Sequence, residues 1–370
     1  MELNVQMIAC IALYVLSEKG REILTVIFLD DFGIFLGRKR NRFIVKKGKE
    51  RRDFPADDVE NIVCTSRGAT LSTSALRLAV RHGVQVVFAM YSGWPYAVLM
   101  PTTVSGSVKT RREQFLAYVD ERGFVLAKNF VMGKVKNQAN VIKLMAKNRR
   151  QTNRSLAEDL YKSGRLIDEI HEKISEERGS NIDEKRLDLM NLEAEAARVY
   201  WRAIASVLPG DIAFNGRKTR GARDPFNVML NFGYQAVLFP EVWKAICYAG
   251  LDPYAGFLHA DRPGKPSLVL DLMEEFRQQV VDRALVGLLS KGVINPGEVL
   301  ATGAEVEEGR VLSKKAVQLI LEALFDRLNS PVMFKGRRGP LKSFIYTQSR
   351  CIARFLLGDS VTYEPFVLGW

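Results

Sequence analysis

The first hundred residues consist of short apolar runs separated by polar turns that contain Asp, Gly, Lys and Arg. Apolar runs at this spacing, with turn residues between them, are typical of strands joined by hairpins. We therefore expect an antiparallel sheet. Its strands would be Ile23–Leu29, Ile34–Leu36, Phe43–Val45 and Val59–Cys64.

One helix is predicted within this strand-rich part. Ser72 can cap its first turn, apolar positions follow at helical spacing, and Gly83 stands where a helix end is expected. Val84–Ala89 then has the composition of a buried strand, and Gly93–Pro95 forms a turn into a last strand.

The pattern changes after Pro101–Gly106, which is rich in turn residues. From Lys109 onwards apolar residues recur at helical spacing, and Pro209, Pro253 and Pro263–Pro266 interrupt them. Ser267, after Pro266, is expected to cap a new helix. Helices are predicted over residues 109–150, 151–176, 183–208, 225–249, 266–291 and 311–328, with one more at Ser343–Leu357 in a tail that Gly336–Leu341 opens.

This pattern predicts an α+β protein with a small N-terminal β-rich domain and a larger all-α domain. The boundaries expected from the pattern are residues 1–100 for the first domain, 101–108 for a linker, and 109–370 for the helical domain with its C-terminal tail.

Charge narrows the class of partner. The formal net charge is +12 and the sequence pI is about 9.5. Lys and Arg side chains that neutralise phosphates gain free energy by counterion release, so a basic chain favours a nucleic-acid partner. No basic amphipathic helix that would lie on a membrane is evident, and an apolar fraction of 47% argues against wholesale disorder.

Four widely spaced cysteines form no CxxC pair, so they indicate neither a zinc knuckle nor a disulfide framework. A reducing cytoplasm is the expected compartment. The apolar segment Val5–Leu16 is shorter than the roughly 20 residues that a bilayer span requires, and it lacks a basic stretch before it. We interpret it as a strand or packing segment.

Three polar features stand out in the helical part. Glu193 shares a helical face with Ala196, Ala197 and Tyr200, which leaves room for a close neighbour, although a solvated Glu beside a helix contact explains the pattern as well. His259 follows an apolar turn and precedes a Pro/Gly-rich loop that would fix its imidazole. A lone histidine, however, is more often structural than a ligand.

The third feature is the helix that begins near Ser267. Asp271, Glu274, Glu275 and Gln278 are expected to share one face, opposite an apolar face. Acidic residues early in a helix also interact favourably with its dipole, which is a structural explanation for them. Their conjunction with His259 and Glu193 in a basic protein favours a divalent-metal site, because carboxylates and one imidazole suit Mg²⁺ or Mn²⁺. Such an ion would neutralise and activate a DNA phosphodiester.

At these segments the sequence resembles the CRISPR-associated integrase of spacer acquisition, the "Cas-one" family. The resemblance is strongest over Asp252–Arg283 (DPYAGFLHADRPGKPSLVLDLMEEFRQQVVDR) and extends to Arg223–Tyr234, Ser72–Phe88, Asn137-Gln138 and Tyr363–Trp370. It covers nearly the whole chain after about residue 25. Two departures are Ala194, where the family commonly has Gly, and residues 1–24, which have no counterpart.

The resemblance implies an N-terminal β domain used for dimerisation or assembly, a C-terminal catalytic α domain, homodimers, and assembly with a small "Cas-two" partner. It also implies that Glu193, His259 and Glu274 are the catalytic metal ligands, with Asp271 as a supporting acid. The implied reaction is insertion of foreign DNA into a CRISPR array, in which a 3′-hydroxyl attacks a phosphodiester. Hydrolytic cleavage is the same chemistry with water.

Several basic residues are candidate contacts to DNA phosphates, although each is individually more often a solvated charge. They are Lys109, Arg111, Arg112, Lys128, Lys134, Lys136 and Arg223. The nine Lys and Arg residues between Arg38 and Arg52 are interpreted as an exposed strand surface.

Two rival functions remain open on the sequence. One is a nuclease that cuts DNA without joining it, and the other is a non-enzymatic DNA-binding scaffold in which the acids only cap a helix.

Overall fold

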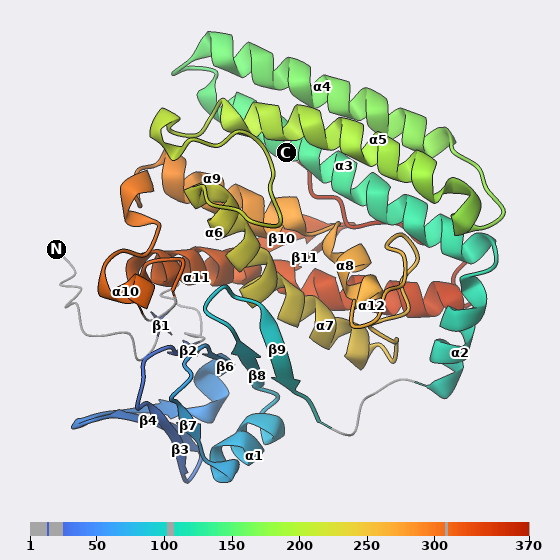
Figure 1. Ribbon diagram of the computed structural model, residues 1–370. Helices are drawn as coiled ribbons and strands as arrows, with labels where there is room; N and C mark the ends of the chain where they lie inside the picture. The colour runs from blue at the N-terminus through green and yellow to red at the C-terminus, as the bar shows by residue number, and fades with distance from the viewer. Residues whose placement is uncertain (1–12, 15–24, 102–106, 308–309, 370) are drawn as a thin grey trace. The chain divides into compact units, whose positions relative to one another are not determined.

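The structure is a computed structural model that describes residues 13–14, 25–101, 107–307 and 310–369. The chain forms two compact units (Figure 1). The N-terminal unit comprises Met1–Thr102 and Glu298–Asp326, and the C-terminal unit comprises Thr103–Gly297 and Arg327–Trp370. The sequence predicted one continuous helical domain over residues 109–370. In the structure, residues 298–326 of that stretch group instead with the N-terminal unit. Most of the predicted linker lies outside the described residues.

The N-terminal unit contains two sheets. The five-stranded sheet has the order β1 (Leu13–Tyr14), β2 (Thr25–Leu29), β6 (Val59–Cys64), β8 (Gln85–Ala89) and β9 (Pro95–Leu99). The four-stranded sheet has the order β5 (Glu50–Pro55), β4 (Arg42–Lys47), β3 (Phe35–Lys39) and β7 (Thr70–Leu71).

The prediction of a purely antiparallel sheet is wrong. Strands β2, β6 and β8 pair in parallel, because each is connected to the next by a crossover: the β3–β5 hairpins in one case and helix α1 (Thr73–Arg81) in the other. The β3–β4 and β4–β5 pairs are antiparallel as expected. Ser72 caps α1 by accepting the Ala75 N–H at 3.2 Å, which confirms that prediction. Of the segment Val5–Leu16, only Leu13–Tyr14 lie among the described residues, as β1.

Residues 298–326 join the N-terminal unit through charge as well as packing. The segment contains α10 (Ala304–Glu307) and most of α11 (Lys314–Asn329). Arg310 donates to the Asp30 carboxylate at 3.1 Å and to the Asp30 carbonyl at 2.9 Å, and Lys314 pairs with Asp31 at 2.9 Å. These partners are about 280 positions apart in the chain, so no local pattern could reveal them.

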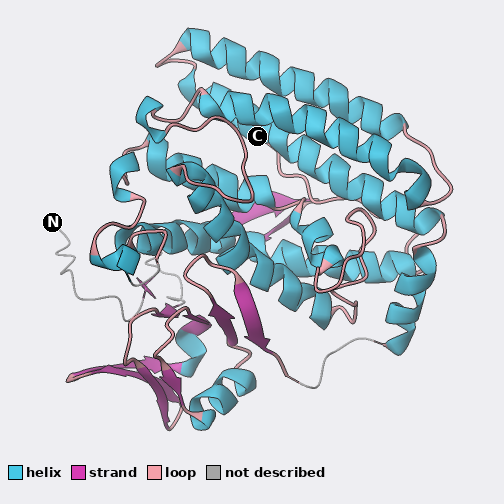
Figure 2. Ribbon diagram, viewed as in Figure 1, coloured by secondary structure: helices cyan, strands magenta, loops and turns pink. Residues whose placement is uncertain are grey.

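The C-terminal unit is mainly helical, as expected, and Figure 2 shows how few strands it contains. Helices α3, α4 and α5 pack side by side as a long layer (Figure 1). The helices of this unit are α2 (Val108–Ala117), α3 (Glu121–Arg149), α4 (Arg154–Glu176), α5 (Ile182–Ala205), α6 (Pro225–Gly233), α7 (Phe239–Tyr248), α8 (Ser267–Met273), α9 (Arg283–Ser290) and α12 (Leu341–Leu356).

Two predicted helices contain π-helical turns. Tyr234–Leu238 joins α6 to α7, and Gln278–Asp282 lies just before α9. The hairpin of β10 (Pro331–Phe334) and β11 (Arg337–Pro340) was not predicted; Lys335 and Gly336, both with positive φ, form its turn. None of the described helices combines the length and the apolar character that crossing a bilayer requires.

Candidate active site

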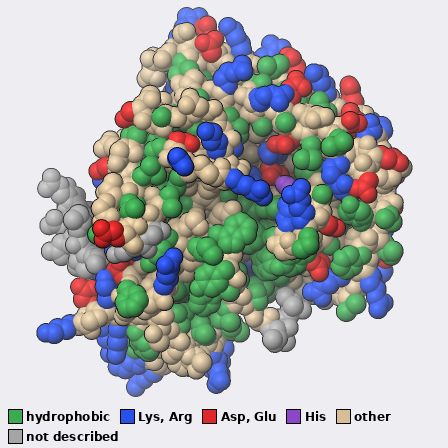
Figure 3. All heavy atoms as spheres, in the orientation of Figure 1, with side chains coloured by type: hydrophobic (Ala, Val, Ile, Leu, Met, Phe, Trp, Pro, Cys, Tyr) green, Lys and Arg blue, Asp and Glu red, His purple; other side chains and the backbone are tan. Residues whose placement is uncertain are grey.

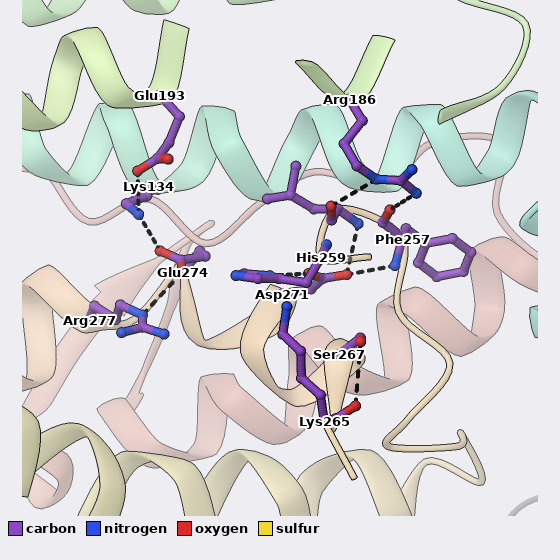
Figure 4. A network of polar contacts seen from close by, with 11 residues as sticks. Lys134, Arg186, Glu193, Phe257, His259, Lys265, Ser267, Asp271, Glu274 and Arg277 are labelled. Carbon is purple, nitrogen blue, oxygen red and sulfur yellow. Dashed lines mark hydrogen bonds and ion pairs between the residues drawn. The ribbon is translucent and has the colours of Figure 1, made fainter. Parts of the chain in front are cut away.

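The site lies in the C-terminal unit, where α3, α5, α8 and the loop before α8 meet (Figure 4). Glu193 is in the middle of α5, and Glu274 follows the last residue of α8. His259 belongs to the loop that links α7 to α8. The three predicted ligands therefore come from separate elements: Glu193 and Glu274 meet at Lys134, and His259 lies beside them.

Lys134 of α3 lies between the two glutamates. Its Nζ is 2.6 Å from Glu193 Oε1 and 2.7 Å from Glu274 Oε2. Arg277 approaches Glu274 from the other side, with Nε 3.2 Å from Oε1. These contacts are ion pairs rather than well-directed hydrogen bonds, since Glu274 Oε2 and Arg277 Nε are buried and neither has a hydrogen-bond partner within the described part of the chain.

The charge state of the cluster follows from these neighbours. Burial by itself would raise the pKa of Glu274, but Arg277, Lys134 and His259 outweigh it and lower that pKa to about 2. Burial also disfavours the Lys134 ammonium, yet Glu274 and Glu193 raise its pKa above the usual value. Glu274 is therefore an ionised carboxylate at any physiological pH, as a metal ligand must be.

Asp271 fixes the histidine loop. It is fully buried and accepts the backbone N–H groups of Phe257, Leu258 and His259 at 2.7, 3.0 and 2.9 Å. The same carboxylate lies 2.6 Å from His259 Nδ1. With a proton on Nδ1, the Nε2 atom of His259 carries a free lone pair.

Two further residues, Gln114 and Arg186, hold the loop that carries His259, and the sequence pattern marked neither of them. Gln114 of α2 binds the backbone N–H of Asp252 at 2.8 Å and the carbonyls of Asp252 and Ala255 at 2.9 and 2.7 Å. Arg186 of α5 donates to the carbonyls of Phe257 and Leu258, both at 3.1 Å. No local pattern marks either side chain, because their acceptors are remote backbone atoms.

Gly256 has a steric role in the same loop. A Cβ at this position would lie 2.5 Å from the Ser267 Cβ and 2.9 Å from Asp271 Oδ2. Real Cβ atoms do not approach so closely, so glycine is needed for the loop to pass over the first turn of α8. The predicted capping role of Ser267 is wrong: Ser267 is the first helical residue, and its hydroxyl is 3.4 Å from the Lys265 carbonyl.

The expectation that Asp271, Glu274, Glu275 and Gln278 share a polar face also needs correction. All four are buried, and Glu275 points to a different cluster from Glu274. It accepts hydrogen bonds from the backbone of Phe366 at 2.7 Å and from Gln348 at 3.1 Å. A shared polar face would have required α8 to remain a regular helix, but it ends at Met273 and irregular turns follow.

A further buried acid, Asp282, is connected to the site through two tyrosines. Asp282 accepts hydrogen bonds from the hydroxyls of Tyr200, at 2.8 Å, and of Tyr234. The guanidinium carbon of Arg277 lies over the Tyr234 ring, 4.7 Å from the ring centroid. This network connects α5 to the cation that contacts Glu274. The sequence predicted that Tyr200 shares a helical face with Glu193, but it gave no indication of the hydrogen bond to Asp282.

The donor set suits Mg²⁺ or Mn²⁺ chemically: two carboxylates, one of them with a buried oxygen that lacks a hydrogen bond, and an imidazole whose Nδ1 is already held. Within the described residues, no three or more His, Cys, Asp or Glu side chains are gathered closely enough to enclose a metal ion. The group that lies between the carboxylates of Glu193 and Glu274 is the Lys134 ammonium.

The candidate DNA contacts divide into two groups. Lys128, Lys134 and Lys136 of α3 all have intramolecular partners: Lys128 donates to the Ser175 and Glu177 carbonyls, and Lys136 pairs with Asp168 at 2.8 Å. A phosphate would have to compete with these partners. By contrast, Lys109, Arg112 and Arg223 are exposed and Arg111 is half-buried. Figure 3 shows a face of the molecule on which Lys and Arg side chains border a histidine.

Comparisons with known proteins identify the family of the chain. The family model described as "CRISPR associated protein Cas1" matches residues 27–325. The "CRISPR-associated endonuclease Cas1 1" of Archaeoglobus fulgidus is 38% identical over 349 residues, which cover 92% of this chain and 99% of that protein. A Cas1 endonuclease of Korarchaeum cryptofilum is 30% identical over 92% of this chain and 97% of its own length.

Solved structures share the fold. A casposase bound to an integration product superposes with a TM-score of 0.76 at 24% identity and covers 92% of both chains. A CAS1 protein from Thermotoga maritima has a TM-score of 0.69 at 22% identity, covering 93% of this chain and 99% of that one. The predicted arrangement of an N-terminal β-rich part and a helical C-terminal part is thus confirmed.

Proposed function

Since the chain belongs to the CRISPR-associated Cas1 family, we propose that it is a metal-dependent DNA endonuclease and integrase that inserts foreign DNA into a CRISPR array. The observation that carries this proposal is the pair Glu193 and Glu274, held around a cation beside an oriented His259. A helix-capping role would not explain acids that come from two different helices and converge on one point.

Glu193, Glu274 and the Nε2 atom of His259 would hold Mg²⁺ or Mn²⁺. When bound, such an ion supplies charge neutralisation at a phosphodiester and activation of an attacking oxygen. The residues of this chain prepare that role. Arg277 keeps Glu274 ionised, and Asp271 holds the His259 loop and the imidazole in one orientation.

The reaction that fits is transesterification. The 3′-hydroxyl oxygen of the incoming strand forms a bond to phosphorus and loses its proton. The bond from phosphorus to the 3′-oxygen of the array strand breaks, and that oxygen takes up a proton and leaves as a 3′-hydroxyl. Hydrolysis differs only in that water supplies the oxygen. The exposed side chains of Lys109, Arg112 and Arg223 are suited to hold the DNA backbone.

The partners proposed for this chain are double-stranded DNA, a second copy of the chain, and a small Cas2 protein. Among proteins with this fold, one solved structure is described as a Cas6-RT-Cas1--Cas2 complex, and it matches 95% of this chain with a TM-score of 0.71 at 19% identity. That likeness supports the fold, and the family membership supports the choice of partners.

The experiment compares wild type with Glu193→Ala, His259→Ala and Glu274→Ala in a strand-transfer assay. The assay offers an oligonucleotide with a free 3′-hydroxyl and a CRISPR-array target in Mn²⁺. We expect each variant to lose strand transfer by about 10³-fold or more while DNA binding persists. Integration by all three variants would exclude this site, and activity in excess EDTA would exclude metal dependence.

The same assay separates the rival functions. A nuclease that only cuts would release fragments in wild type without forming a joined product. A DNA-binding scaffold would give neither cleavage nor joining in wild type, although binding would remain.

A further inference from the structure

Lys134 holds an unusual position for a lysine. Helix α3 carries it in an apolar stretch between the buried residues Val131 and Val135, and its side chain is only 16% exposed. Its ammonium is within 2.7 Å of two carboxylates that come from α5 and from the end of α8. Figure 4 shows it bridging them.

The bridging contact is specific to Lys134. Arg277, the other cation at the cluster, is 3.2 Å from Glu274 through its Nε atom and stacks on Tyr234, so its guanidinium is held on the far side of that acid. Lys134 therefore joins Glu193 to Glu274 in the way that a shared cation joins two ligands.

The inference rests on the proposed function, because it concerns the metal site assigned there. We propose that Lys134 is the internal counter-ion of that site, and that its ammonium and the divalent metal are alternative occupants of the space between Glu193 and Glu274. Binding of the metal then requires the Lys134 side chain to move out.

Charge balance explains why the two cations exclude each other. The negative charges of Glu193 and Glu274 are matched by the positive charges of Lys134 and Arg277, so these four side chains together are neutral without metal. A divalent ion added with Lys134 in place would leave an excess of two positive charges among buried groups, where uncompensated charge is costly. If Lys134 moves out, the excess falls to one.

The side-chain chemistry also makes exchange easy. A lysine ammonium is a point charge on a flexible four-carbon stem, so it can leave by rotation about its own bonds without a change in the backbone of α3. Until then it keeps the two carboxylates together, which would otherwise repel each other. The lysine thus preserves the arrangement of the acids and at the same time weakens the apparent affinity for metal.

The test measures Mn²⁺ binding to the full-length protein by isothermal titration calorimetry, independently of activity. Lys134→Met removes the competing charge and keeps much of the side-chain volume. We expect it to bind Mn²⁺ about tenfold more tightly than wild type, or better. Lys134→Arg keeps the charge and should bind no more tightly than wild type.

Lys136→Met is the matched control. It removes a lysine two positions along the same helix, whose partner is Asp168 rather than a residue of the site. Its dissociation constant for Mn²⁺ should equal that of wild type.

The outcomes separate this inference from the proposed function. If wild type binds no Mn²⁺, the proposed metal site itself fails. If wild type binds Mn²⁺ but Lys134→Met binds it equally or more weakly, the site stands and the exchange of cations is excluded.

A second measurement covers the case in which Lys134→Met does not fold. In a crystal structure of wild type with Mn²⁺, the Lys134 ammonium should lie outside hydrogen-bonding distance of at least one of the two glutamates. A bound metal with Lys134 still within 3 Å of both would overturn the proposal, where 3 Å is about the usual length of a hydrogen bond.

Discussion

Glu274 and Glu275 are adjacent in the chain and both are buried, yet they lie in opposite environments. Glu274 faces the cations Lys134 and Arg277, and its pKa falls to about 2. Glu275 faces neutral groups, namely the Phe366 backbone and the side chains of Gln348 and Tyr363, and burial raises its pKa to about 8. The difference shows that burial does not decide the charge of an acid. The neighbouring cations do.

Their roles follow from their charges. An acid that stays ionised can serve as a metal ligand, whereas an acid that faces neutral donors at the chain's C-terminal segment can hold that segment in place. Asn137 supports the second role, because its amide donates to the carbonyls of Glu275 and Phe366 at 2.9 and 2.8 Å. The Phe366 ring also stacks on Phe276, with centroids 4.8 Å apart. Four experiments test this division between the proposed catalytic cluster and a tail-holding cluster.

The largest effect is expected from Glu274→Gln. This change keeps the size of the side chain and removes its charge, so strand transfer should fall by about 10³-fold or more. Glu275→Gln is the control and should retain strand transfer within about tenfold. Comparable losses in both variants, measured as initial rates of joined product, would show that the two clusters are not functionally distinct.

The second experiment concerns pH. The pKa of Glu275 is about 8 in the folded chain and near 4.5 when unfolded, so the folded chain retains a proton that the unfolded chain has lost. The resulting stability is fully present below about pH 4.5 and is lost as the pH rises through 8. We expect this group to lower the free energy of unfolding by roughly 4 kcal/mol across that range.

Glu275→Gln should remove this loss, so its urea midpoint should change less between pH 5 and pH 8.5 than that of wild type. Equal pH dependence in the two proteins would mean that Glu275 is already ionised in the folded chain at pH 5.

The third experiment is Asp271→Asn. The amide can accept fewer of the loop's hydrogen bonds, and it presents a donor where His259 Nδ1 needs an acceptor. Because Asp271 supports a ligand, we expect metal affinity to fall by about 10- to 100-fold. Calorimetry with Mn²⁺ measures it, and an unchanged affinity would remove Asp271 from the catalytic cluster.

The smallest effect is expected from Tyr363→Phe. It removes the hydroxyl that donates to Glu275 and should lower stability by about 1 kcal/mol, measured by urea unfolding at pH 7. Strand transfer should be unchanged. A clear loss of strand transfer would indicate that the tail-holding cluster also shapes the active site.

Much of the helical framework could be predicted from sequence. Apolar residues at helical spacing and the prolines located most helices within a few residues, as for α4 (Arg154–Glu176) against a prediction of 151–176. Strand β5 (Glu50–Pro55) was missed, because its sequence ERRDFP is mostly charged; such a composition suits an edge strand, which it is.

The candidate site was predictable in its chemistry and less so in its arrangement. Residue types and the family resemblance selected Glu193, His259 and Glu274; the structure joins the two glutamates through Lys134 and places His259 beside them. Lys134 was interpreted as a DNA contact, since a lysine's neighbours across helices are not encoded locally. For the same reason the residue pattern alone could not separate Glu274 from Glu275, and the family resemblance made that choice.

The π-helical turn Gln278–Asp282 has a consequence for how such chains tolerate insertions and deletions. A π turn accommodates one residue more than an α-helix would over the same rise. The wide turn therefore shifts the residues after it by about 100° relative to an uninterrupted α-helix of the same sequence. Asp282, which ends the turn, then faces Tyr200 and Tyr234. Numbering this segment by regular helical repeats therefore assigns its inward-facing residues to the wrong side. Loss of one residue from the π turn is expected to be tolerated better than loss of one from α9, which has no extra residue to lose.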